Sequence, residues 1–121
     1  MLALKIPKLS PWPSDEGVYG DYTNKSYAKH RSRWTRDGLI TLYYSYTTIV
    51  AFSDGNGLHV CQNVWSSTTG KHLNWLSTNK KSRLPLKTFQ ELLDKAHERN
   101  EKLRMLSELL TRQKTHKKVG D

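Results

Sequence analysis

The chain has 121 residues and carries twenty lysines and arginines against eleven acids, a formal net charge of +9. This length suits one domain with a modest core. Hydrophobic residues make up only 36 % of the chain, but four tryptophans, six tyrosines and two phenylalanines can bury large areas, which argues against a wholly disordered chain. The single cysteine, Cys61, excludes an internal disulfide and a cysteine-based zinc site, and we expect it to be a small buried hydrophobe.

No apolar run approaches the roughly 20 residues that a membrane-spanning helix needs. The apolar start of the chain is interrupted by Lys5 and Pro7, unlike a signal peptide. We therefore expect a cytoplasmic protein without membrane contact.

The positive charge is concentrated between residues 22 and 90, where ten cations face only Asp37 and Asp54. This segregation predicts a partner of opposite charge, with nucleic acid (DNA or RNA) as the first choice and an acidic protein surface or an anionic membrane after it. The alternative is that the charge only keeps the protein soluble.

Residues 1–20 contain three prolines around Trp12, a composition that favours an extended arm in front of a single domain over residues 21–121. We favour an arm that docks Trp12 on the chain's own core, or one that is disordered, over an arm that binds a partner.

The segment from Thr23 to Arg36 has aromatic and basic residues at helical spacing, with Gly38 as a possible stop, and so predicts a helix. Cations interleave with Tyr27 and Trp34, as in surfaces that stack on bases and contact phosphates. An amphipathic helix with core aromatics and solvated cations is the slightly favoured alternative.

Three strands follow. Leu39–Tyr44 and Thr47–Phe52 are rich in β-branched and aromatic residues, and residues 54–57 (Asp-Gly-Asn-Gly) suit a hairpin turn. In the next segment Leu58, Val60 and Gln62 would share one face of a strand, with His59, Cys61 and Asn63 on the other. The pattern predicts an antiparallel meander.

Two helices complete the predicted fold. Residues 65–75 should form a short helix capped by Ser66, Ser67 or Thr68. A capping box at Thr88 begins a long helix that reaches about Lys114. The predicted fold class is α+β: a small antiparallel β-meander with a short helix and a long C-terminal helix.

The apolar residues of the long helix recur in alternating steps of three and four, the spacing of a coiled-coil seam, with a polar break at Arg99. The half after Arg99 could leave the domain and form a homo-oligomer through the 89–113 helix. Packing back on the sheet is the equal alternative.

The segment Ser67-Thr68-Thr69-Gly70-Lys71-His72 lacks the first glycine and the final hydroxyl of a nucleotide-binding loop, so it does not predict ATP or GTP binding. Its hydroxyls at a helix N-terminus, together with Lys71 and His72, could bind an anion. Alternatively, the hydroxyls only cap the helix and His72 hydrogen-bonds within the core.

No catalytic arrangement stands out. The five histidines are scattered without metal-ligand spacing. Three acids of the last helix, Glu91, Glu98 and Glu108, form i,i+4 pairs with cations, which suits a solvated helix face. We expect no metal, no cofactor and no enzymatic activity.

Two blocks resemble a family of small phage and prophage proteins catalogued as a domain of unknown function. Residues 45–51 match S-Y-x-T-x-[VI]-A, and residues 65–72 match W-S-x-T-T-x-K-H. The resemblance covers about a third of the chain and implies a phage origin, but it implies no activity.

Taken together, these patterns predict a phage-encoded, non-catalytic accessory protein of the host cytoplasm that binds nucleic acid or a nucleoprotein complex. The cations would contact phosphates, and Tyr44, Tyr46 and Trp65 would stack on exposed bases. The alternatives are an anti-defence inhibitor of the anti-CRISPR type that contacts a host effector, and a virion or assembly component. The candidate binding residues are Lys25, Lys29, Arg31, Arg33, Arg36, Tyr44, Tyr46, Trp65, Ser67, Thr68, Thr69, Lys71, His72, Lys80, Lys81 and Arg83.

Overall fold

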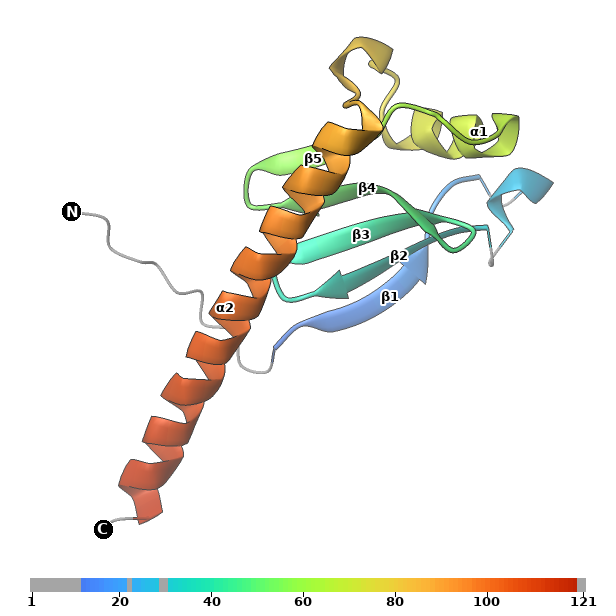
Figure 1. The fold of residues 1–121 in the computed structure, drawn as a ribbon. Coiled ribbons are helices and arrows are strands. Elements are labelled where there is room, and N and C mark those ends of the chain that lie inside the picture. The colour runs from blue at the N-terminus through green and yellow to red at the C-terminus, as the bar shows by residue number, and fades with distance from the viewer. Residues whose placement is uncertain (1–11, 22, 29–30, 120–121) are drawn as a thin grey trace.

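A five-stranded antiparallel sheet forms the centre of the computed structural model, which describes residues 12–21, 23–28 and 31–119, the last eight by backbone alone (Figure 1). The strands lie side by side in sequence order and are β1 (Ser14–Val18), β2 (Ser32–Asp37), β3 (Ile40–Ser45), β4 (Thr48–Asp54) and β5 (Gly57–Val60). Two α-helices, α1 (Ser67–Leu76) and α2 (Leu86–Val119), and two short 3-10 helices, η1 (Lys25–Tyr27) and η2 (Lys80–Ser82), complete the fold. The predicted α+β class is confirmed.

The last three strands confirm the predicted meander, with ends that differ by a few residues. Cys61 lies beyond the end of β5, where it forms an isolated parallel bridge with Leu84. It is fully buried, as expected for a small hydrophobe, and this burial raises the pKa of its thiol.

The first strand corrects the predicted boundary after residue 20. β1 pairs with β2 from Ser14 opposite Asp37 to Val18 opposite Arg33, so this part of the proline-containing segment belongs to the sheet. Residues 1–11 of the predicted arm lie outside the described residues.

Trp12 docks on the chain itself, at the turn between β2 and β3. Its indole N–H donates a hydrogen bond to the Asp37 carboxylate. Its ring lies so close to Gly38 that a Cβ atom there would be 1.9 Å from it, and the φ of +62° at Gly38 also favours glycine. Glycine is therefore needed at position 38 for the turn and for the contact with Trp12. The predicted role of Gly38 as a helix stop is wrong.

The predicted helix from Thr23 to Arg36 is wrong. Among the residues of this segment that the structure describes, only Lys25–Tyr27 is helical, as a single 3-10 turn capped by the Asn24 side chain, and Ser32–Asp37 is strand β2. β2 lies between β1 and β3, which satisfy its backbone groups on both sides. Pairing with two neighbours outweighs the helical spacing of the segment's aromatic and basic side chains.

The core consists of two clusters, one under each helix. In the first cluster Phe89, Leu93 and Ala96 of α2 pack on Ile40, Phe52 and Cys61. In the second cluster Leu73 of α1 packs on Val50, Ala51 and Val60. A β-bulge separates them: Tyr43 pairs with Ala51 but Tyr44 pairs with Ile49, which leaves Val50 as an extra residue. Val50 and Ala51 can therefore both pack toward α1 while Phe52 packs toward α2.

The long helix α2 begins two residues earlier than predicted. Its first turn is closed by the N–H of Phe89 donating to the carbonyl of Pro85, 2.9 Å, so Thr88 lies inside the helix and the predicted capping box is wrong. The helix also continues beyond Lys114. None of the helices in the described ranges is long and apolar enough to cross a membrane.

Asn100 fixes α2 to the β2–β3 turn. Its buried side chain donates to the carbonyl of Asp37 (2.8 Å) and accepts from the N–H of Leu39 (3.1 Å). Past this point the helix runs beyond the sheet (Figure 1), and its apolar side chains Met105, Leu106, Leu109 and Leu110 are exposed. Asn100 and Leu103 still lie against the sheet, and the helix leaves the domain after them, close to one of the two expected arrangements; pairing with another copy stays a prediction.

We predict that Asn100→Ala lowers the free energy of unfolding by about 1–3 kcal/mol, because two backbone groups of the turn lose their buried partner. Urea unfolding measures the change, with Gln90→Ala at an exposed position of the same helix as the control. Equal stability of Asn100→Ala and the wild type would show that the turn does not depend on this contact.

Candidate nucleic-acid interface

The side chain of His72 lies on the inner face of α1 and has a relative exposure of 0 %. Its Nδ1 is 2.8 Å from the hydroxyl of Ser45 on β3, and its Nε2 contacts the carbonyl oxygen of Ser26 in η1. Because a carbonyl can only accept, Nε2 carries the proton, and Nδ1 accepts from Ser45. His72 thus joins a strand, a 3-10 helix and an α-helix.

The hydroxyls around His72 form a chain with one direction. Ser45 donates to His72 and accepts from the hydroxyl of Thr69, 2.9 Å away. Thr69 accepts from the hydroxyl of Ser66, and Ser66 caps α1 by accepting from the N–H of Thr69, both at 3.2 Å. Each group has a partner when His72 is neutral.

The pKa of His72 is lowered, chiefly by burial and also by the charge of Arg31, while the hydrogen bond to Ser26 opposes this change. The imidazole is therefore held in its neutral form.

Burial removes Thr69 and His72 from the predicted anion site. Neither side chain is accessible to a ligand, and both serve the alternative role of capping the helix and hydrogen-bonding in the core. Ser67 and Lys71 are exposed at the start of α1 and Thr68 is half-buried, so these three side chains keep some access to solvent.

Around this buried network the structure gathers cations and aromatic side chains on one surface. Tyr27 packs against Trp75, with ring centroids 6.0 Å apart, and donates its hydroxyl to the carbonyl of Lys71 (2.9 Å). Trp75 is 55 % exposed, and it shares a face of α1 with Lys71, four residues before it. The packing of Tyr27 therefore brings η1 alongside the exposed Lys71 and Trp75.

Tyr46 and Arg31 lie beside the same network. The N–H of Tyr46 donates to the carbonyl of Arg31 (2.9 Å), and the Tyr46 ring is 6.3 Å from that of His72. The Arg31 guanidinium donates to the carbonyl of Lys25 (3.1 Å), so Lys25 is close by. We call Lys25, Arg31, Tyr46, Lys71 and Trp75 the aromatic–basic surface.

One acid lies at the edge of this surface. Asp21 is near Tyr27, and its carboxylate accepts from the N–H and the hydroxyl of Thr23 at 3.0 and 2.8 Å. These hydrogen bonds lower the pKa of Asp21, which stays ionised and offsets part of the local positive charge.

The other predicted cations have different surroundings. Arg33 lies over the ring of Tyr44, 4.0 Å from its centroid, and so occupies one face of a predicted stacking residue. Arg36 is exposed on β2 and donates to the carbonyl of Gly38 (3.2 Å). Neither arginine belongs to the aromatic–basic surface.

Arg83 is only 8 % exposed and serves the fold. It donates to the Asn74 side chain (2.7 Å) and to the carbonyl of Ser77 (3.1 Å), where it holds the end of α1. These contacts assign Arg83 to the fold, and its contact with phosphate stays a prediction.

The remaining predicted residues fall outside these contacts. Lys80 and Lys81 are exposed on η2, and Trp65 is exposed just before α1. Lys29 lies outside the described residues.

Trp75 was missing from the sequence prediction, although a signal existed. It follows Lys71 by four residues in a segment already predicted to be helical, which places both on one face. Its exposure depends on how α1 packs on the sheet, and the spacing of residues does not reveal that.

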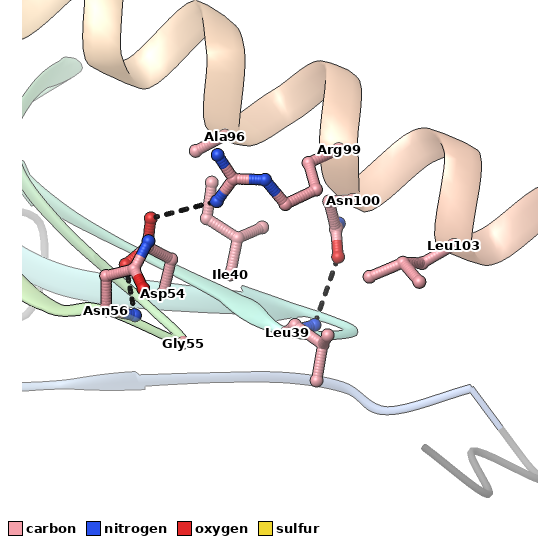
Figure 2. Close-up of a pocket in the computed structure, with 9 residues that line it drawn as sticks. All are labelled: Leu39, Ile40, Asp54, Gly55, Asn56, Ala96, Arg99, Asn100 and Leu103. Carbon is pink, nitrogen blue, oxygen red and sulfur yellow. Dashed lines mark hydrogen bonds and ion pairs between the residues drawn. The ribbon is translucent and has the colours of Figure 1, made fainter. Parts of the chain in front are cut away.

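A second cluster, also not predicted, lies at the far end of the sheet. A cavity of about 210 Å³ opens between α2 and the hairpin turns, with apolar walls that include Ile40, Ala96 and Leu103 (Figure 2). The Asp54 carboxylate lies 3.9 Å from the Arg99 guanidinium across it. Arg99, the polar break in the coiled-coil spacing, therefore pairs with a turn residue of the sheet.

The Asp54 carboxylate also accepts from the N–H of Asn56 (2.9 Å) and contacts the ring of His59 (3.2 Å). Its oxygens thus already have protein partners, and the cluster joins the helix to the turn. Among the residues that the structure describes, no group of three or more His, Cys, Asp or Glu side chains could hold a metal ion.

Comparison with known proteins gives a family but no relative of known activity. The model of a family of unknown function (DUF8033) matches residues 17–91, which span β1 to the first turns of α2. No curated protein and no solved structure matches the chain.

We predict that stability falls as the pH drops below about 6.5, the usual pKa of histidine. The pKa of His72 is lower in the folded than in the unfolded chain, so its contribution is complete above 6.5 and is lost as the pH falls toward the folded value. The loss should reach at most about 1.4 kcal/mol per pH unit. Urea unfolding at pH 7.5, 6.5 and 5.5 measures it.

His97→Gln, at an exposed position of α2, serves as the control and should keep the wild-type pH dependence. His72→Gln should flatten it. An NMR titration in the folded wild type showing His72 protonated at pH 6.5 would contradict the neutral ring.

Proposed function

The chain belongs to the family of unknown function DUF8033, and we propose that it is a non-catalytic accessory protein that binds nucleic acid or a nucleoprotein complex through the aromatic–basic surface. The two sequence blocks that resemble phage proteins support a phage origin and action in the host cytoplasm. Both blocks contribute to the proposed surface, the first through Tyr46 and the second through Lys71.

The observation that carries this proposal is the clustering of three exposed cations with two exposed aromatic rings at one end of the sheet. Cations attract the phosphate backbone, and aromatic rings bind the faces of bases, whatever the sequence. The net charge of +9 adds long-range attraction to any polyanion. A solvated surface that only kept the protein soluble would not need the exposed rings.

A non-catalytic role is supported by the burial of the hydroxyl and imidazole that come closest to a nucleophile–base pair. Ser45 and His72 are hydrogen-bonded, but both are fully enclosed and His72 donates to a backbone carbonyl. A substrate could not reach the Ser45 hydroxyl without opening the fold.

Fluorescence anisotropy with labelled duplex DNA, single-stranded DNA and RNA, over about 50 to 200 mM salt, tests the proposal. Binding that weakens steeply with salt would support it. No binding to any of the three at 50 mM salt would contradict it and leave the basic surface as a protein-docking surface.

We predict that Lys25→Ala combined with Lys71→Ala weakens binding to all nucleic acids alike. Each lost phosphate contact should reduce the slope of log K against log salt by about 0.7 to 0.9, so the double variant should lose up to roughly 1.4 to 1.8. Lys87→Ala with Lys95→Ala, two exposed lysines of α2, is the matched control and should leave both affinity and slope close to the wild type. Equal effects of the two pairs would point to net charge instead of a defined surface.

A second candidate function, as an assembly component, is favoured by the part of α2 that projects past the sheet. Met105, Leu106, Leu109 and Leu110 are exposed there. An unpartnered apolar helix face suits pairing with another helix. An anti-defence inhibitor could use the same face to grip a host effector.

We predict that, if the chain self-associates through α2, Leu106→Glu with Leu110→Glu produces monomers, because buried carboxylates in the seam are costly. Sedimentation velocity over a range of concentrations measures this, with Gln90→Glu on the same helix as the control. A wild type that is monomeric at every concentration would contradict the assembly role.

A further inference from the structure

Tyr46 has a backbone conformation that the fold does not require. Its φ is 59°, and it is the one non-glycine residue with positive φ among the residues that the structure describes. The other positive φ values belong to Gly20, Gly38 and Gly57. An L-residue with an aromatic side chain is disfavoured there, so the choice of tyrosine needs a reason.

Packing does not supply that reason. The side chain of Tyr46 is 43 % exposed, whereas Tyr19 and Tyr27 beside the same histidine are buried. The hydrogen bond that fixes the backbone runs from the N–H of Tyr46 to the carbonyl of Arg31, and glycine would donate it equally well. The turn would therefore form with glycine at this position, without the strain.

What the tyrosine adds is a ring with a defined direction. The residue lies between the ends of β3 and β4, tied to Arg31 by its backbone and flanked by His72, whose ring centroid is 6.3 Å away. Ser45, the residue before Tyr46, is hydrogen-bonded to His72 and pairs with Thr48, the first residue of β4. The ring is consequently presented to solvent from a rigid base.

The surroundings of this ring carry positive charge. The backbone carbonyl of Arg31, which precedes β2, accepts from the N–H of Tyr46, and the Arg31 side chain is exposed. Lys71 is exposed on α1 and is next in the chain to His72, whose ring is 6.3 Å from that of Tyr46. An exposed aromatic ring near two cations suits the binding of an unpaired nucleotide. Its base would stack on the ring, and the phosphates on either side would contact the cations. In a duplex the base faces are stacked on one another and are not accessible to a side chain.

We propose that the chain binds single-stranded nucleic acid and that Tyr46 is held in its strained conformation to stack on an unpaired base, while Arg31 and Lys71 contact the flanking phosphates. This inference rests on the proposed function, since it assigns a substrate class to the same surface. It also assigns to Tyr46 a role in binding ligand, for which the strained backbone lowers local stability.

The test compares Tyr46→Gly and Tyr46→Phe with the wild type, using labelled oligo-dT, oligo-U and a duplex DNA of the same length at about 100 mM salt. Tyr46→Gly should keep or raise the midpoint of thermal unfolding, because it relieves the strained φ. It should weaken single-strand binding by about ten-fold or more and leave duplex binding within two-fold. Tyr46→Phe, which keeps the ring, should bind single strands like the wild type.

Ultraviolet cross-linking of the wild type to oligo-U, followed by peptide mass spectrometry, gives an independent reading and should locate the cross-link at Tyr46. Single-strand binding by Tyr46→Gly equal to that of the wild type would overturn the inference and leave the proposed function standing. A lower unfolding midpoint for Tyr46→Gly, with unchanged affinity, would assign the ring to the fold and also overturn it. Absence of nucleic-acid binding by the wild type would overturn both proposals.

Discussion

The hydrogen bonds of a neutral, buried histidine organise the end of the molecule where the candidate interface lies. The carbonyl of Ser26 requires a proton on one ring nitrogen of His72, and that choice sets the donor and acceptor of every bond back to Ser66. Protonation would place a second donor against Ser45 and require its hydroxyl to accept instead of donate, in a site where both side chains are buried. Buried polar networks are stabilising only when each member is satisfied, so β3, η1 and α1 are joined only in one arrangement.

The same network places the residues that face solvent. Tyr27 packs on the ring of His72, at a centroid distance of 5.3 Å, and thereby brings Lys25 and Trp75 close together. The ring of Tyr46 lies 6.3 Å from that of His72 and remains 43 % exposed. An interior contact that has no access to a ligand thus determines how the exposed cations and rings are arranged, as supporting groups do in many binding sites.

The core is divided into two clusters because the bulge in β4 directs Val50 and Ala51 toward α1 and Phe52 toward α2. The cluster under α1 supports the aromatic–basic surface, whereas the cluster under α2 holds a helix that runs beyond the sheet and exposes Met105, Leu106, Leu109 and Leu110. Asn100 and the pair of Arg99 with Asp54 fix the direction of that helix at the turns. The cations likewise have different roles. Arg83 supports the fold and Arg33 covers the ring of Tyr44, so neither of them belongs to the aromatic–basic surface.

Local patterns in the sequence were sufficient for the β3–β5 meander, α1 and α2. These elements are recognised from patterns that extend over only a few residues: β-branched runs, turn residues that tolerate positive φ, and apolar residues in steps of three and four. Such patterns can be read without knowing which other segment the element packs against. The prediction of a helix over residues 23–36 was wrong because helical spacing in a sequence does not exclude a strand. β2 forms there through pairing with β1 and β3, which the segment itself does not reveal. Likewise, no local signal in the proline-containing segment shows that residues 14–18 complete the sheet.

The sequence by itself determined the α+β class, the charge excess and the candidate residues for binding a polyanion, because composition and short-range spacing carry that information. Only the tertiary structure decided which of them face solvent. Ser45 and His72 are 27 residues apart, and Leu39 and Asn100 are 61 apart. Contacts over such separations depend on how helices settle on the sheet, which buries His72, diverts Arg83 to the fold and leaves Tyr46 and Trp75 exposed.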